Sequence, residues 1–202
     1  MKKIALLIAA ISTLILSGCS SSNDAEPSFD EVLLSRRSVR SYQPDRIIEE
    51  SQLRELFQAI QNAPSWANQQ PSKYYVALSP ESRNAVLEFM GSNKAQVANA
   101  SALIVSTYER GKSGFFQGQQ ANEIGDGWGA HDNGLSNAYL VLKARAMGFD
   151  SLIMGIRDAD GLHRLFDIPE NETVMAVIAL GYRAGDPAIP VHKPLDNLVK
   201  FF

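Results

Sequence analysis

The clearest candidate for anion binding is the segment Arg36–Arg40, which holds Arg36, Arg37, Ser38 and Arg40 within five positions. Planar guanidinium groups bind phosphate or carboxylate oxygens in pairs, and the Ser38 hydroxyl adds a donor. The segment therefore indicates a compact site for one phosphate or carboxylate group. Taken alone, the same run also fits a solvated basic turn.

A second candidate is the loop 63–71, which contains two prolines, a tryptophan and several side-chain amides: Pro64, Ser65, Trp66, Asn68, Gln69, Gln70 and Pro71. Amides can pair with the edge of a heterocyclic ring, and proline or tryptophan can pack against its face. The loop therefore indicates a site for a planar ligand. Trp66 also has a plainer interpretation, as a core or interface aromatic.

Other common site types are not supported by the spacing of their residues. The glycines do not match a phosphate-binding P-loop, a dinucleotide fingerprint or a nucleophile elbow. The three histidines, His131, His163 and His192, are scattered, so we expect no metal site.

The composition describes a globular protein and excludes several classes. The chain has 202 residues, of which 45% are hydrophobic, enough to form a core and to exclude wholesale disorder. A net charge of −3 argues against a nucleic-acid partner. The single cysteine excludes an internal disulfide and every multi-cysteine metal site.

The first residues have the layout of a secretory signal. Two lysines precede the apolar run Ile4–Leu16, which is short for a transmembrane helix. The segment Leu16–Cys19 resembles the lipobox of bacterial lipoproteins, in which the peptide is cut before the cysteine and the cysteine is acylated. The alternative is a first helix, anchored in a membrane or buried, with an incidental cysteine.

The lipoprotein interpretation divides the chain into a signal peptide (1–18), a flexible polar tether (19–28) and one folded domain (29–202). Cleavage before Cys19 removes residues 1–18 with two lysines, which leaves 184 residues and changes the net charge from −3 to −5. It predicts lipid anchoring through Cys19 in the cell envelope, in the periplasm or at the outer membrane. Ser20 is not the acidic residue that retains some lipoproteins at the inner membrane, so an outer membrane is favoured.

Hydrophobic periodicity predicts alternating helices and strands in one α/β or α+β domain. We expect helices at 29–34, 53–60, 81–90 and 158–166, and a long one from Trp128 to a glycine cap at Gly148. Strands are expected at 74–78, 102–107, 151–154 and 174–180. The predicted buried face of the long helix is Leu135, Ala138, Tyr139 and Leu142.

The order of these motifs resembles that of the nitroreductase family of flavin enzymes. The matching segments are Arg36–Arg40, Ala63–Pro71, the long helix ending at Met147–Phe149, Met154–Asp158 and Leu180–Tyr182. The likeness runs from about Phe29 to Phe202. It implies an α+β fold with a central sheet wrapped by helices, and an obligate homodimer with a swapped tail and FMN in the interface.

The resemblance also implies roles for individual residues. Arg36, Arg37 and Ser38 would face the FMN phosphate and ribityl chain, and Arg40 would reach the N1/O2 edge of the ring, where a cation stabilises the reduced flavin. Backbone N–H groups near Gly155 and Ile156 would lie beside flavin N5. The second subunit would contribute Pro64, Ser65, Trp66 and Asn68.

Several positions leave a question open. Asn93 and Gln96 fall where the family places contacts to the ring edge or ribityl, but they also fit a cap or a helix surface. The tail has His192 where many members have a phosphate-binding arginine, which would weaken FMN binding unless Lys193 compensates. Phe115 and Phe116, in the insert Gly111–Gly129, would form a substrate lid or fill the dimer interface.

The implied activity is an NAD(P)H-dependent flavin oxidoreductase. Hydride would pass from NAD(P)H through flavin N5 to nitroaromatics, quinones or similar electron-poor acceptors, with no catalytic side chain required. Two alternatives remain open: an envelope flavin-binding protein with little or no turnover, and a related flavin reaction such as reductive dehalogenation.

Overall fold

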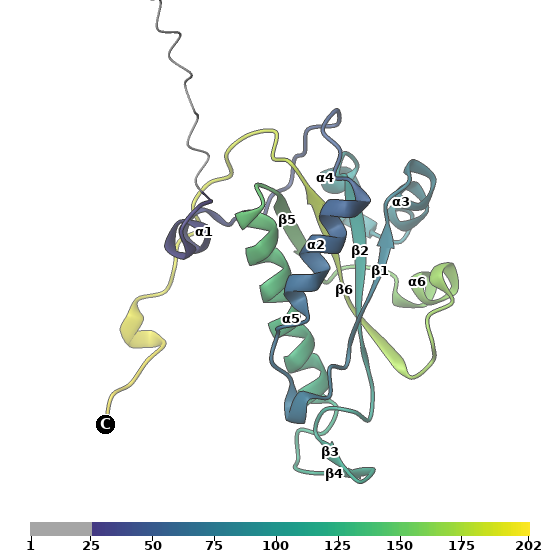
Figure 1. Ribbon diagram of the computed structural model, residues 1–202, viewed down its shortest axis with the longest axis vertical. Helices are drawn as coiled ribbons and strands as arrows, with labels where there is room; N and C mark the ends of the chain where they lie inside the picture. The colour runs from purple at the N-terminus through teal and green to yellow at the C-terminus, as the bar shows by residue number, and fades with distance from the viewer. Residues whose placement is uncertain (1–25) are drawn as a thin grey trace, which may run out of the picture.

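The computed structural model describes residues 26–202 and is built on a four-stranded antiparallel sheet (Figure 1). The strand order is β1-β2-β6-β5. The strands are β1 (Ser72–Ala77), β2 (Ala102–Glu109), β5 (Asp150–Met154) and β6 (Glu172–Gly181). The central strands β2 and β6 are buried on both faces, as the apolar run 174–180 predicts.

Helices cover both faces of this sheet. On one face α2 (Glu50–Ile60) and α5 (Gly127–Ala146) pack side by side, and α1 (Phe29–Ser35) contacts α5 (Figure 1). On the other face lie α3 (Pro80–Leu87), α4 (Lys94–Val97) and α6 (Ala159–Phe166). The predicted α+β class, with a sheet wrapped by helices, is confirmed.

Alternation along the strands explains the two-sided core. On β2, Ile104 faces α2 and α5, whereas Leu103 and Val105 face the helices of the other layer. Successive strand residues point to opposite faces, so a doubly covered strand must be apolar throughout. The register between β2 and β6 shifts after Ser106, where Met175 is left without a partner.

The predicted elements are confirmed with small changes at their ends. The Ser79 hydroxyl accepts the Ser82 N–H at the start of α3, which has Pro80 in its first turn. The Asp158 carboxylate accepts the Gly161 N–H at the start of α6. Gly148, with φ of +83°, follows the end of α5 as the predicted glycine cap.

The predicted buried face of α5 is wrong. Ala138 and Tyr139 are exposed, and Leu135 and Leu142 are only partly buried. The buried residues of α5 are instead Gly129, Asp132, Asn133, Ser136, Asn137, Leu140, Val141 and Ala144. Because half of this buried face is polar, the more apolar stripe identified from spacing lies on the outer side of the helix.

Two segments extend from the sheet and its helices. The insert Gly111–Gly129 forms a short hairpin of β3 (Phe115–Phe116) and β4 (Gln119–Gln120) beside the start of α5 (Figure 1). The tail after Pro187 is exposed, has one 3₁₀ turn at Leu195–Asn197 and runs away from the sheet. No helix within residues 26–202 is long and apolar enough to cross a membrane.

Candidate flavin site

The basic segment Arg36–Arg40 lies along the open edge of the sheet. Ser38 pairs with Ser151 of β5 in a parallel bridge, and the Val39 N–H donates to the Ser151 carbonyl over 3.0 Å. Arg36 ends α1 in an extended conformation. The strand edge therefore fixes the backbone that carries the predicted phosphate-binding residues.

The guanidinium groups of this segment have no acidic partner. No ion pair within residues 26–202 involves Arg36, Arg37 or Arg40. Arg37 Nη1 donates to the Arg36 carbonyl over 2.8 Å, and Arg40 Nη1 donates to the Ser38 carbonyl over 3.3 Å. Most of their donors remain available to an anion.

A buried ion-pair network holds the start of this segment. The Asp150 carboxylate, 4% exposed, accepts Arg183 Nε over 2.8 Å and Arg145 Nη1 over 3.2 Å. Both arginines also bind Ser35: Arg145 Nε donates to its hydroxyl, and Arg183 Nη2 donates to its carbonyl. Hydrogen bonding to Asp150 raises the pKa of Arg183.

Gly155 and Ile156 follow the end of β5 on the same edge. Gly155 is four residues beyond Ser151, a separation of about 13 Å along an extended strand. Asn93 Nδ2 donates to the Ile156 carbonyl over 3.2 Å. Gln96, one turn further along, has a buried Oε1 without a hydrogen-bond partner in the described residues. The structure thus brings Asn93 to the predicted N5 segment.

The loop 63–71 lies at the opposite end of α5. The Trp66 N–H donates over 2.8 Å to Asp132 Oδ2, near the helix start, whereas Ser35 binds Arg145 near its end. Asp132 and Arg145 are thirteen residues apart, about 20 Å along the helix axis. One chain therefore does not bring Pro64, Ser65, Trp66 and Asn68 to its own Arg36–Arg40 segment.

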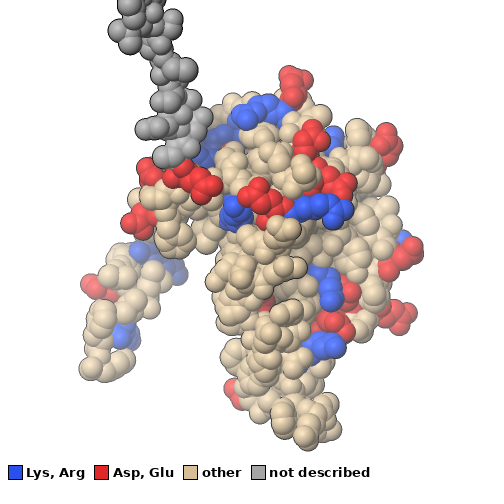
Figure 2. Space-filling view, viewed as in Figure 1, with Lys and Arg blue, Asp and Glu red and all other residues tan. Residues whose placement is uncertain are grey.

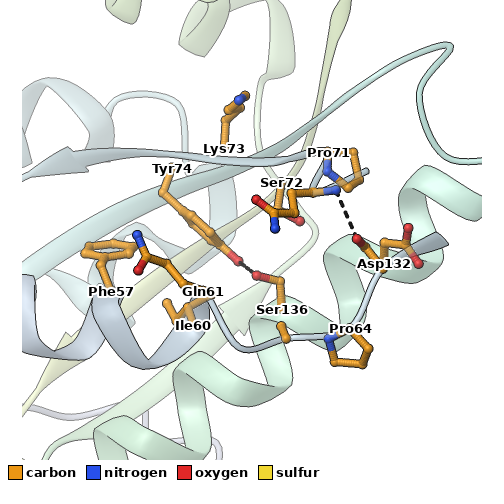
Figure 3. A pocket seen from close by; sticks show the side chains of 13 residues that line it. Phe57, Ile60, Gln61, Pro64, Pro71, Ser72, Lys73, Tyr74, Asp132 and Ser136 are labelled. Atoms are coloured by element: carbon orange, nitrogen blue, oxygen red, sulfur yellow. Dashed lines mark hydrogen bonds between the residues drawn. The ribbon is translucent and has the colours of Figure 1, made fainter. Parts of the chain in front are cut away.

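The loop has a constrained backbone and borders a cavity of about 310 Å³. Ala67, Asn68 and Gln70 have positive φ angles, and the Gln70 N–H donates to the Ser65 hydroxyl over 2.9 Å. In the cavity wall the Tyr74 hydroxyl lies 2.7 Å from Ser136 Oγ, and Pro64 and Pro71 border the same space (Figure 3).

Trp66 belongs to an aromatic cluster with residues at the start of α5. Its ring centroid is 4.8 Å from that of Trp128, and His131 lies edge-on to Trp128. Trp128 Nε1 donates to Asn122 Oδ1 in the insert. The insert therefore lies beside loop 63–71, and its Phe116 is 71% exposed.

The remaining predicted residues lie in the exposed tail. His192 and Lys193 make no side-chain hydrogen bond or ion pair with residues 26–202. The structure does not bring either residue to the basic segment. Cys19 lies outside the described residues. Within residues 26–202, no three His, Cys, Asp or Glu side chains form a group that could hold a metal ion.

Several residues that position the site were not predicted from the sequence. Asp132 holds the backbone of loop 63–71, and Asp150 with Arg145 and Arg183 holds the segment before Arg36. The polar run Asp132, Asn133, Ser136 and Asn137 has helical spacing and could have indicated a polar buried face. No local spacing connects Asp150 with Arg183, because their pairing depends on the ladder of β5 with β6.

The model of the nitroreductase family matches residues 33–182, more than half of the chain. The chain belongs to the nitroreductase family. The match spans the basic segment, loop 63–71 and the end of β5, and it stops before His192. It lies within the predicted domain 29–202.

Relatives of nearly equal length support the assignment. The chain is 24% identical over 202 residues to the putative NAD(P)H nitroreductase YdgI of Bacillus subtilis, covering 86% of this chain and 97% of the relative. A putative NADH dehydrogenase/NAD(P)H nitroreductase of Archaeoglobus fulgidus is 29% identical over 156 residues, covering 75% of this chain and 83% of the relative.

The fold is that of solved nitroreductase structures. A putative nitroreductase from Exiguobacterium sibiricum in complex with FMN superposes with a TM-score of 0.79 at 19% identity, covering 87% of this chain and 98% of that one. The NADPH:FMN oxidoreductase of Vibrio harveyi complexed with NAD+ gives a TM-score of 0.71 at 23% identity, covering 86% of this chain and 76% of that one.

Proposed function

We propose that this nitroreductase is an NAD(P)H-dependent flavin oxidoreductase that holds FMN between two subunits and reduces electron-poor acceptors such as nitroaromatics or quinones. The family assignment supports the enzyme class and the cofactor. The single observation that carries the residue-level proposal is the run of arginines on the open edge of β5. They have no acidic partner within residues 26–202, and Gly155 and Ile156 lie at the end of that edge.

The residues present fit FMN chemically. The guanidinium groups of Arg36, Arg37 and Arg40 suit a phosphate, because no carboxylate within residues 26–202 neutralises them. About 13 Å further along the edge, the backbone N–H groups near Gly155 suit an electron-rich ring edge. The buried Gln96 Oε1, which has no hydrogen-bond partner among the described residues, is an acceptor, and a flavin ring carries one N–H donor.

The chain's own residues act through binding and positioning. When bound, FMN supplies the hydride transfer at its N5 atom. Arg36, Arg37 and Ser38 would hold the phosphate, and Arg40 would place a positive charge where the reduced ring is negative. The proposed reaction requires no side-chain acid, base or nucleophile.

The test is to add FMN to the purified protein and titrate it with NADH or NADPH under anaerobic conditions while recording the visible spectrum. Bleaching of the bound flavin is expected, and the more effective nicotinamide identifies the donor. A protein that stays colourless and does not quench FMN fluorescence contradicts the proposal. A protein that binds FMN but is not reduced supports the alternative of a flavin-binding protein without turnover.

The proposed homodimer accounts for the separation of the two halves of the site. A second copy would bring its loop 63–71 to the first copy's Arg36–Arg40 segment. The outer face of α5, with Tyr139 41% exposed, suits such a contact, and the surface over the lower part of α2 and α5 carries few charges (Figure 2).

An apolar cavity supports the proposed tail exchange. An apolar cavity of about 460 Å³ lies between α1, α2 and α5 and is lined by Phe29, Val32, Ala59, Tyr139 and Leu142, among others. The exposed tail carries Leu198, Val199, Phe201 and Phe202. We propose that the tail of a second copy covers this apolar surface, which would give His192 and Lys193 a fixed place in the assembly.

The proposed location is the cell envelope, with a lipid anchor at Cys19. The support is the signal-like order of a basic start, an apolar run and the segment Leu16–Cys19. Metabolic labelling with palmitate should mark the membrane fraction of the wild-type protein and not the Cys19→Ser variant. Unlabelled wild-type protein in the soluble fraction contradicts the anchor.

A further inference from the structure

The turn that follows β5 is fixed by contacts to its carbonyl groups. Arg157 Nη1 donates to the Gly155 carbonyl over 3.2 Å, and Asn93 Nδ2 donates to the Ile156 carbonyl over 3.2 Å. Arg157 Nη2 also donates to the Val174 carbonyl of β6. One arginine and one asparagine thus tie this turn to the neighbouring strand and to the segment before α4.

The N–H groups of the same turn are left free. Within residues 26–202, no acceptor is hydrogen-bonded to the backbone N–H of Gly155 or Ile156. The Ser151 carbonyl faces away from β6, because it accepts the Val39 N–H. Backbone groups alternate along a strand, so the Gly155 N–H faces the same open edge as the basic segment.

The cost of placing Arg157 here is visible in the structure. Its Nε is buried without a hydrogen-bond partner, and its guanidinium has no carboxylate partner within residues 26–202. A buried donor without a hydrogen-bond partner is destabilising, because it has lost its water and gained nothing in exchange. Arg157 has this unfavourable feature, yet it contacts two carbonyl groups and orients one turn. This combination indicates a role beyond packing.

We propose that Arg157 and Asn93 are positioning residues: by holding the carbonyl groups of Gly155 and Ile156, they aim the free N–H groups of this turn at the N5 edge of bound flavin. The inference rests on the proposed function and assigns this role to two side chains of this chain. In this proposal Asn93 acts on the flavin indirectly, by holding the backbone at Ile156.

The expected consequence depends on the redox state of the flavin. N5 of a bound flavin would be the better hydrogen-bond acceptor in the oxidised ring, because it carries its own hydrogen when reduced. An N–H group aimed at N5 therefore favours oxidised FMN. Loosening the turn should weaken the binding of oxidised FMN more than that of reduced FMN, which makes the midpoint potential less negative.

The test compares Arg157→Lys and Asn93→Ala with the wild-type protein. The lysine keeps the positive charge but does not reproduce the planar fork, and neither change alters net charge. Both variants should bind oxidised FMN about three- to tenfold more weakly, which corresponds to one net hydrogen bond. Reduced FMN should be affected less, and the midpoint potential should shift in the positive direction.

Arg83→Lys is the matched control. Arg83 is partly buried and donates to two main-chain carbonyls, those of Leu78 and Ser101, but does not contact the turn after β5. This variant should keep the wild-type affinities and potential. Equal weakening of both redox states in the Arg157 and Asn93 variants, or the same shift in the Arg83 variant, overturns the inference.

A flavin-free measurement separates this inference from the proposed function. NMR relaxation of the Gly155 and Ile156 amides in the protein without FMN should show greater mobility in both variants than in the wild type. Unchanged mobility overturns the positioning role, whether or not FMN binds. Absence of FMN binding to the wild-type protein overturns only the proposed function.

Discussion

Asp150 joins three parts of the chain through two arginines. It lies at the start of β5, Arg145 comes from the last turn of α5, and Arg183 follows β6. Both guanidiniums also bind Ser35, directly before the basic segment. One buried carboxylate therefore fixes the chain that leads to the proposed phosphate site, while two arginines satisfy its charge.

Replacing Asp150 by Asn should lower the free energy of unfolding by about 3 kcal/mol, because two guanidinium groups lose their carboxylate in a largely buried place. Urea denaturation of the flavin-free protein measures the effect. Asp186→Asn is the control: Asp186 also pairs with Arg183, over 3.2 Å, but its side chain is 93% exposed. The Asp186 variant should unfold with nearly the wild-type free energy. Equal losses of stability in both variants would contradict the role given to Asp150.

At the scale of elements, α5 packs on the sheet through a polar layer. Ser106 Oγ is 3.0 Å from both Asn133 Oδ1 and Asn137 Oδ1, and the Tyr74 hydroxyl meets Ser136 and Asn137. Burial raises the pKa of Tyr74 to about 12. The Tyr74 hydroxyl therefore keeps its proton, and its role as a donor, well above neutral pH.

The Tyr74→Phe variant should be less stable than the wild type at pH 7 by about 1–2 kcal/mol, because buried partners lose their donor. The difference should narrow above pH 10. The unfolded tyrosine ionises near pH 10 and the folded one only near 12, so the unfolded state binds fewer protons in this window and stability falls as pH rises. Denaturation curves from pH 7 to 11.5 check this, and a constant difference contradicts it.

How much the sequence predicts depends on whether the cause is local. The strand at 174–180 and the cap at Gly148 were predicted because apolar runs and left-handed caps are local signals. The buried face of α5 was not predicted, because the choice between its apolar stripe and its polar stripe depends on the hydrogen-bond partners in the sheet. Ser106 and the Tyr74 hydroxyl form hydrogen bonds with residues of the polar stripe, so the polar stripe can be buried.

The same distinction applies to the candidate site. Arg36–Arg40 and loop 63–71 have local compositions that indicate binding. Arg157 and Asn93 acquire their proposed role only when the chain folds, because their acceptors are main-chain carbonyls without a sequence signature. The separation of Arg36–Arg40 from loop 63–71 by the length of α5 is likewise a property of the fold.

At the scale of the whole molecule, the exposed stripe on α5 predicts the assembly. Tyr139→Glu places a charge on that stripe and should convert the proposed dimer to a monomer, because an unpaired charge is costly to bury. Light scattering after size exclusion measures the mass, and FMN binding should be lost with the dimer. Leu165→Glu, at an exposed apolar position on α6, is the control and should remain dimeric.

A monomeric wild-type protein would contradict both the assembly and the shared site. A dimeric Tyr139→Glu variant with normal FMN binding would place the interface elsewhere.

The length of α5 has a consequence for mass action. If the two proposed halves of the site, about 20 Å apart on one chain, come together only in the proposed dimer, flavin retention is a property of subunit pairs. Apparent FMN affinity should then rise with protein concentration until all chains are paired, and dilution should release flavin together with subunits. Confinement of the chains to a membrane surface would favour pairing at low abundance, since tethering raises the local concentration of one chain around another.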